Sequence, residues 1–208
     1  MRLRPQALDL KRRAPRQDRA LDTVDTIFEA AARILQSEEK DAFNTNHIAE
    51  RAGISIGTLY QYFPNKNAIL IALARRESER VRKAVLQAVT TSDVGGRPER
   101  IAVRALIHGF AGRHRARRIL LEILLAEGGG AELAKPVEEI AQILGATGNS
   151  PVLAHGKPLT PVSLFVLTRA VIGVIREATT EGSAFLGTPE IEDELVRLIQ
   201  GYLAKLRE

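Results

Sequence analysis

Residues 44–66 read NTNHIAERAGISIGTLYQYFPNK, and this stretch decides the fold. Its pattern predicts two short helices joined by a tight turn at Gly53, a residue that ends a helix at low cost by adopting a left-handed backbone. Asn44 or Thr45 can cap the first of the two helices. The arrangement is typical of a helix-turn-helix, which places its second helix in the DNA major groove.

The second helix of this stretch divides into a buried and an exposed face. Ser55 can cap it, and Leu59 and Phe63 lie four residues apart, so both are predicted to point toward the core. The polar and aromatic residues that remain face outward and are Thr58, Tyr60, Gln61 and Tyr62. Such side chains suit contacts to phosphates and base edges. Gln61 is the expected hydrogen-bonding reader of a base.

The string IAERAGISIGTLYQYFPNK at 48–66 resembles the DNA-binding signature of the TetR family of bacterial transcription regulators. The strong resemblance covers roughly residues 20–72, and the remainder is similar in its helical layout. Asn67 departs from the pattern, because many members have an acidic residue there. The resemblance implies an all-α protein with an N-terminal three-helix DNA-binding domain. It also implies a larger C-terminal helical domain that binds a ligand and dimerises.

The resemblance also implies roles for single residues. Thr45, Tyr62 and Lys66 match positions that hold phosphates, which fixes the register on DNA without reading sequence. Positions that face the groove are matched by Ile56, Gly57, Thr58, Tyr60 and Gln61. Together with Ser55, these eight residues form the predicted DNA-binding set, and its partner is an inverted-repeat operator in double-stranded DNA.

Composition limits the possible classes of protein. The chain has 208 residues and a net charge of +5, which favours an anionic partner. It has no cysteine, so a disulfide framework and a thiolate metal site are excluded. We find neither the ~18 consecutive apolar residues of a membrane span nor the apolar segment of a secretory signal. These features predict a cytoplasmic protein without a membrane partner.

Positive charge is concentrated in residues 1–20, which hold seven basic and two acidic residues. Pro5 and Pro15 discourage a continuous helix there, so residues 1–18 are predicted to form a flexible basic arm. The arm either tracks phosphates or enters the minor groove, or it is a solvated tail.

Helical periodicity predicts the rest of the organisation. A DNA-binding domain is expected over 19–72 and a C-terminal domain over 73–208. The expected helices cover 19–36, 66–89, 98–113, 116–126, 132–144, 160–181 and 189–206. No segment has the strict alternation of a strand over a useful length, so the fold class is all-α. The run RHRARR at 113–118 is expected to be a solvated turn between two helices.

The two helices over 160–181 and 189–206 are strongly apolar. They either complete the core or pair with their copies in a second subunit as a four-helix interface. The resemblance favours a homodimer. The predicted interface residues are Leu164, Thr168, Val171, Ile175, Leu195, Leu198 and Tyr202.

The middle of the chain is the region where the resemblance implies a small-molecule effector. Candidate lining residues are Leu106, His108, Phe110, Leu120, Ile123, Leu124 and Phe165. For each of them a place in the plain core is the alternative, and His108 is more simply explained as a core histidine. Because aromatic residues make up only 4% of the chain, an aliphatic or modestly polar ligand is the better fit.

No catalytic constellation emerges from the sequence. The histidines lack partners at metal-ligand spacing, and no serine lies in a nucleophile-elbow context. We therefore expect no enzymatic activity, no cofactor and no metal. The resulting prediction is a homodimeric repressor that a small molecule releases from its operator. The alternatives are an architectural DNA-binding protein whose C-terminal domain only dimerises and a helical ligand-binding protein or enzyme with a vestigial DNA motif.

Overall fold

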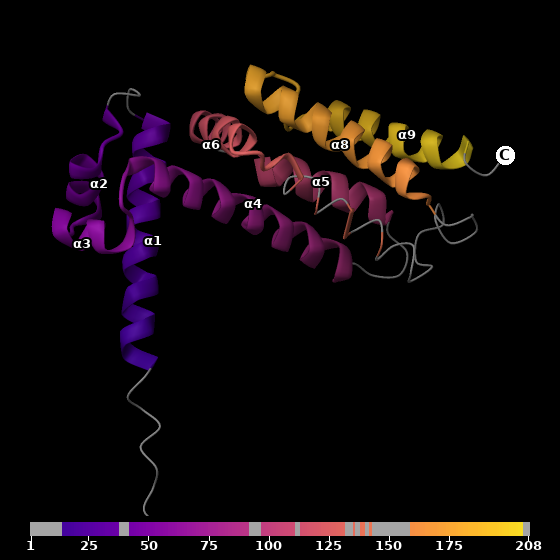
Figure 1. Cartoon of the computed structure of the whole chain (residues 1–208). Coiled ribbons are helices and arrows are strands. Elements are labelled where there is room, and N and C mark those ends of the chain that lie inside the picture. Colours follow the sequence, from indigo (N-terminus) through magenta and orange to yellow (C-terminus); the bar gives the residue numbers. More distant parts are fainter. Residues whose placement is uncertain are drawn as a thin grey trace, which may run out of the picture. The chain divides into compact units, whose positions relative to one another are not determined.

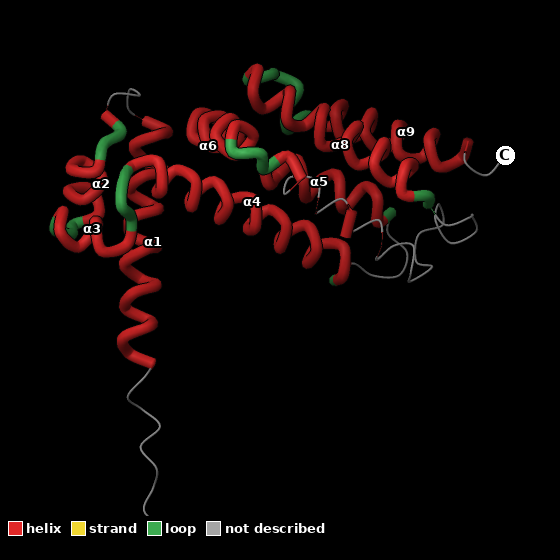
Figure 2. Tube along the Cα trace, viewed as in Figure 1, coloured by secondary structure: helices red, strands yellow, loops and turns green. Residues whose placement is uncertain are grey.

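The computed structural model describes residues 14–37, 42–91, 97–110, 113–131, 135, 138–139, 142 and 159–205. All elements in these ranges are α-helices, as Figure 2 shows, and the all-α prediction is confirmed. The chain divides into two compact units, residues 1–69 and 70–208.

Unit 1 contains α1 (Ala14–Ser37), α2 (Thr45–Ala52) and α3 (Ile56–Tyr62) (Figure 1). Helix α1 begins five residues before the predicted start at Arg19, so the prediction of a flexible arm is wrong for residues 14–18. Pro15 does not prevent this, because proline lacks a backbone N–H and the first turn of a helix has no intrahelical acceptor for one. The rest of the predicted arm, residues 1–13, lies outside the described residues.

The core of unit 1 is built from the apolar faces of these three helices. Ile27 and Ile34 of α1, Ile48 of α2 and Leu59 of α3 are all completely buried. Phe63, directly after α3, packs its ring 5.5 Å from the ring of Phe28 of α1, measured between centroids. These contacts fix α2 and α3 on α1 and leave the other side of α3 free.

Helix α4 (Lys66–Thr90) belongs to both units, because the boundary between them falls after Ile69. The Asn65 side chain caps this helix, and its Oδ1 accepts a hydrogen bond from the backbone N–H of Ala68 at 2.9 Å.

Unit 2 contains most of α4 together with α5 (Pro98–Phe110), α6 (His114–Ala126), α8 (Pro161–Glu181) and α9 (Pro189–Lys205). Helix α8 packs against α5 and α6, and α9 returns alongside α8 and contacts α5 (Figure 1). A further helix predicted over 132–144 lies almost wholly outside the described residues. None of the helices that the structure describes is long and apolar enough to cross a membrane.

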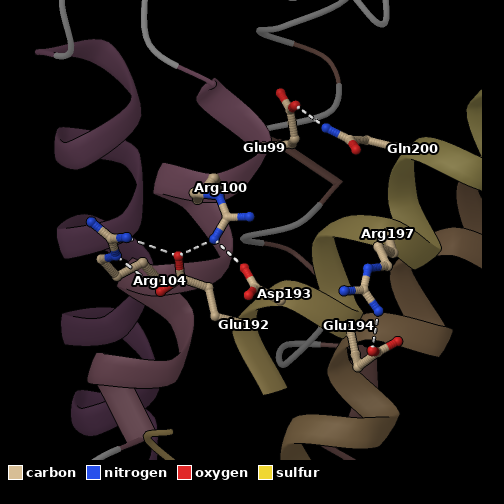
Figure 3. Close-up of polar contacts among 8 residues, drawn as sticks. All are labelled: Glu99, Arg100, Arg104, Glu192, Asp193, Glu194, Arg197 and Gln200. Carbon is tan, nitrogen blue, oxygen red and sulfur yellow. Dashed lines mark hydrogen bonds and ion pairs between the residues drawn. The ribbon is translucent and has the colours of Figure 1, made fainter. Parts of the chain in front are cut away.

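An ion cluster joins α5 to α9 (Figure 3). The buried carboxylate of Glu192 accepts hydrogen bonds from Arg100 at 2.9 Å and from Arg104 at 2.8 and 2.9 Å. Arg100 also donates to Asp193 at 2.6 Å. The hydrogen bonds from Arg104 and then Arg100 lower the pKa of Glu192, so the cluster is fully charged at neutral pH.

Candidate nucleic-acid interface and ligand cleft

Helix α2 begins and ends as the sequence predicts. Asn44 is the N-cap, and its Oδ1 accepts a hydrogen bond from the backbone N–H of His47 at 2.9 Å. Gly53 ends the helix at φ 67°, in the left-handed region that glycine adopts without strain. The N–H of Ile54 then donates to Ala49 O at 3.0 Å, so the chain turns sharply into α3.

Helix α3 has seven residues and a defined N-terminus. Ser55 is its N-cap, as predicted, and the Ser55 Oγ accepts from the Thr58 N–H at 3.0 Å. The two hydroxyls of Ser55 and Thr58 also share a hydrogen bond at 2.8 Å. Leu59 is the one buried residue of α3, so the short helix is held by its cap and by a single core side chain.

The predicted DNA-binding residues lie together along α3 and its two flanks. Tyr60 is 51% exposed and Ile56 is 37% exposed, although both are large side chains. Gly57 and Gln61 are also exposed, whereas Thr58 and Tyr62 are half-buried. The exposed apolar and aromatic surface has no role in the core of unit 1, and it is available for a partner.

Two flanking residues extend this surface. The Thr45 hydroxyl, at the start of α2, lies 3.2 Å from the Tyr60 hydroxyl, so the two side chains orient each other. Exposed Lys66 is the first residue of α4, where unpaired backbone N–H groups also attract anions. Thr45, α3 and Lys66 thus bring hydroxyl, amide and ammonium donors to one part of unit 1.

A small cleft of about 40 Å³ lies wholly within unit 2, between α4 and α6. Its apolar walls come mainly from Val81, Leu120, Leu121 and Leu124, and its polar groups come from Glu77, Ser78 and Arg117. This volume is far below the roughly 300–1,000 Å³ of typical small-molecule sites.

The structure separates the predicted ligand residues. Leu120 and Leu124 line the cleft, whereas Leu106 is buried in the core and Ile123 is half-buried without lining it. His108 is exposed, so the expectation of a core histidine is wrong. Phe165 of α8 is also exposed, and it is not among the residues that line the cleft. The side chain of Phe110 lies outside the described part of the chain.

Sequence reasoning missed Arg117, because it treated residues 113–118 as a solvated turn. Helix α6 begins at His114, and Arg113 before it is left-handed at φ 34°. Arg117 therefore lies three, four and seven residues before Leu120, Leu121 and Leu124, on the apolar face of the same helix. When the apolar spacing of α6 is continued one turn toward the N-terminus from Leu120 and Leu121, it reaches Arg117, and this was the signal in the sequence.

The predicted dimer residues differ in their exposure within the single chain, and the interface itself stays a prediction. Thr168, Val171 and Ile175 of α8 and Leu195 of α9 are buried within the protomer, where α8 packs against α5, α6 and α9. Leu164 and Tyr202 are half-buried, and Leu198 alone of the set is exposed. The free apolar side chains of α8 are instead Val162, Phe165, Val166 and Val174.

Unit 1 matches a known protein family. Residues 27–73 match the family described as bacterial regulatory proteins, tetR family. An uncharacterized HTH-type transcriptional regulator of Mycobacterium tuberculosis is 34% identical over 79 residues, which is 38% of each chain. The HTH-type transcriptional repressor KstR of Mycolicibacterium smegmatis is 38% identical over 55 residues, or 26% of this chain and 27% of KstR. The chain thus matches well under half the length of these curated relatives.

The likeness in fold extends much further. The fatty acid degradation regulator FadR of Bacillus halodurans aligns with 93% of this chain and 96% of its own, at a TM-score of 0.60 and 19% identity. A capped α3 that follows α2 across a tight turn forms a helix-turn-helix, and the elements described in unit 2 are helices. The match to the tetR family of bacterial regulatory proteins therefore covers residues 27–73, and over the rest of the chain the likeness to solved structures is one of fold.

Proposed function

We propose that this chain is a cytoplasmic, homodimeric transcription repressor that binds an inverted-repeat operator and releases it when a small molecule binds unit 2. The observation that carries the proposal is the exposed face of α3. Tyr60, Gln61 and Ile56 are held outward on a helix that is fixed by the Ser55 cap and by Leu59. The naming of the relative KstR as a repressor supports the sign of regulation.

The proposed interface makes two kinds of contact with DNA, one to phosphates and one to base edges. Lys66 and the hydroxyls of Thr45 and Tyr62 hold phosphates, which positions α3 without reading sequence. Gln61 reads a base edge, and Ile56 or the Thr58 methyl contacts a thymine methyl. Gly57 is exposed in the first turn of α3, where the absence of a side chain lets the backbone approach the groove.

The proposed dimer forms through the free face of α8 and α9. Val162, Phe165 and Val166 lie within two helical turns and are 71%, 57% and 45% exposed. Leu198 of the adjacent α9 adds a further exposed apolar side chain. Pairing this face with its copy gives a four-helix interface, and two α3 helices then read two half-sites about one helical turn apart.

The proposed release is a shift between two states of the dimer. Four residues of α4 line the cleft, namely Ala74, Glu77, Ser78 and Val81, and the same helix begins directly after the helix-turn-helix. A ligand that binds better when α4 takes another position favours the state in which the recognition helices are wrongly spaced. To reverse occupancy from nearly full to nearly empty, the ligand must discriminate between the states by roughly 5 kcal/mol.

Selection of binding sites from a random duplex pool at near-physiological salt tests the proposal. We expect an enriched inverted repeat. Gln61→Ala should then lose about 1–3 kcal/mol of discrimination at one base position. Lys66→Ala should weaken binding to all DNA sequences equally, and it should reduce the slope of log affinity against log salt concentration by about one.

Lys83→Ala is a matched control for Lys66→Ala, because it removes the same charge from the exposed surface of α4 within unit 2. It should leave the salt slope unchanged. If no sequence is enriched and binding depends strongly on salt, the result would support an architectural DNA-binding protein instead. Uniform losses in both the Gln61 and the Lys66 variants would contradict the division of labour.

A further inference from the structure

The hydroxyl groups of Thr45 and Tyr60 lie 3.2 Å apart, which joins the first turn of α2 to the second turn of α3. The two residues are 15 positions apart in the chain, so the contact depends on the fold of the helix-turn-helix. The Tyr60 side chain is 51% exposed and has no place in the core of unit 1. Its position is therefore set by a neighbouring helix as well as by its own.

The number of hydroxyl protons limits what this pair can donate. Each hydroxyl carries one proton and accepts hydrogen bonds through its oxygen lone pairs. One of the two protons lies between Thr45 Oγ1 and Tyr60 Oη, and either oxygen can be its donor. A single O–H thus remains to point outward, and it is polarised by the hydrogen bond that its own oxygen accepts. Together the two side chains present one outward donor.

The surroundings of the pair favour an anion as the acceptor. At the start of α2, the Asn44 side chain accepts a hydrogen bond from the His47 N–H. The Asn44 carbonyl accepts from the Ile48 N–H. The N–H groups of Thr45 and Asn46 have no acceptor within the helix, and the helix dipole places partial positive charge there. Hydroxyls of DNA-binding proteins donate mainly to phosphate oxygens, whereas reading a base requires a pattern of donors and acceptors.

From this arrangement we infer that Thr45 and Tyr60 act as one unit that holds a single phosphate oxygen of the DNA backbone. The resemblance of the sequence separates the two, with Thr45 at a phosphate and Tyr60 facing the groove. Their hydrogen bond instead brings the Tyr60 hydroxyl to the residue that is assigned to a phosphate. Tyr60 therefore contributes to the register of α3 on DNA and does not read a base. The inference rests on the proposed function, because it describes how the proposed interface meets the DNA backbone.

A double-mutant cycle on the selected operator tests the inference, with affinities measured by fluorescence anisotropy of a labelled duplex. Tyr60→Phe and Thr45→Val each remove one hydroxyl and keep the overall shape of the side chain. We expect each to weaken binding by about three- to tenfold. The double variant should be no weaker than the weaker single variant, within about twofold. Two independent phosphate contacts would instead multiply their losses, to roughly ten- to a hundredfold.

Two further measurements separate a phosphate contact from the reading of a base. Tyr60→Phe should weaken binding to the operator and to operators with one changed base pair by the same factor, whereas Gln61→Ala loses preference at one base position. The slope of log affinity against log salt concentration should stay unchanged in Tyr60→Phe, because a neutral hydroxyl releases no counterion. An altered base preference in Tyr60→Phe, or losses that multiply in the double variant, would overturn the inference.

Matched substitutions control for the fold and for the loss of a hydroxyl elsewhere. Thr45→Ser keeps the hydroxyl and should bind as the native chain does, and a loss as large as that of Thr45→Val would overturn the inference. Thr26→Val removes a hydroxyl that bonds within α1, to the Asp22 carbonyl, and should leave the affinity unchanged. If thermal unfolding shows that Thr45→Val does not fold, Thr45→Ala completes the cycle.

The same measurements distinguish failure of the inference from failure of the proposed function. Absence of operator binding by the native chain contradicts the proposed function, and the inference falls with it. Sequence-specific binding by the native chain, combined with losses that multiply in the double variant, contradicts the inference alone.

Discussion

Replacing Glu192 by glutamine tests what the ion cluster contributes to the stability of unit 2. The substitution preserves the shape of the side chain and removes its negative charge. Glu192 is buried and accepts three hydrogen bonds from Arg100 and Arg104, whose side chains are 29% and 57% exposed (Figure 3). Water can therefore solvate the two arginines partly when their shared carboxylate is lost.

The expected loss in the free energy of unfolding of Glu192→Gln lies between two limits. Breaking a fully buried ion pair costs about 3–5 kcal/mol, whereas an exposed pair contributes below about 1 kcal/mol. Since Glu192 is buried but its arginine partners reach solvent, we expect the free energy of unfolding to fall by about 1.5 kcal/mol in Glu192→Gln. Glu194→Gln is the control, because Glu194 and its partner Arg197 lie on the same helix and are 68% and 70% exposed. It should cost less than about 0.5 kcal/mol.

Urea unfolding followed by circular dichroism measures both variants at one protein concentration, since the proposed dimerisation would make the transition concentration-dependent. The folded-state pKa of Glu192 is lowered, so its contribution is complete above the ordinary glutamate pKa. That contribution is lost as the pH falls through the lower folded-state value. The deficit of Glu192→Gln should therefore shrink in acid. Equal and small losses in both variants, or a deficit that does not change with pH, would refute the reasoning.

Two further predictions concern the cap of α3 and the dimer. Ser55→Ala removes the acceptor of the Thr58 N–H and should destabilise the protein by about 1 kcal/mol in thermal unfolding. Ser55→Asp keeps an N-cap acceptor and should be nearly neutral. Equal losses of stability in the two variants would contradict the role of the cap. Val166→Glu puts a charge on the exposed apolar face of α8 and should shift the proposed dimer toward monomer in sedimentation velocity. Leu21→Glu, which replaces an exposed apolar residue of unit 1, should leave the dimer intact, and a dimer that tolerates Val166→Glu would place the interface elsewhere.

Local signals explain why unit 1 was predictable. Its turn and caps depend on single residues with specific backbone or hydrogen-bonding preferences, and Gly53 and Ser55 occupy the predicted places. Even the pair Leu59 and Phe63 was assigned to the core from spacing alone. The start of α1 was misplaced, because the effect of Pro15 depends on its position within a helix whose first residue the sequence does not mark.

Unit 2 was less predictable because its helices are apolar on more than one face. The stripe through Thr168, Val171 and Ile175 and the stripe through Phe165 and Val166 have the same period, and only packing shows which one faces the protomer core. Arg117 was missed for a related reason, since a charged residue within a basic run looks solvated until its neighbours on the helix are known.

In α3 the residues that hold the helix in place are different from the residues that are exposed, and this has a consequence for how such a protein diversifies. One side chain, Leu59, anchors the helix, and the cap residue Ser55 lies before it. Positions 56, 57, 60 and 61 are exposed and contribute little to the core. Substitutions there can change the exposed surface of the helix while folding stays intact, so under the proposed function a few exchanges within one short segment would give a duplicated copy a new set of target genes.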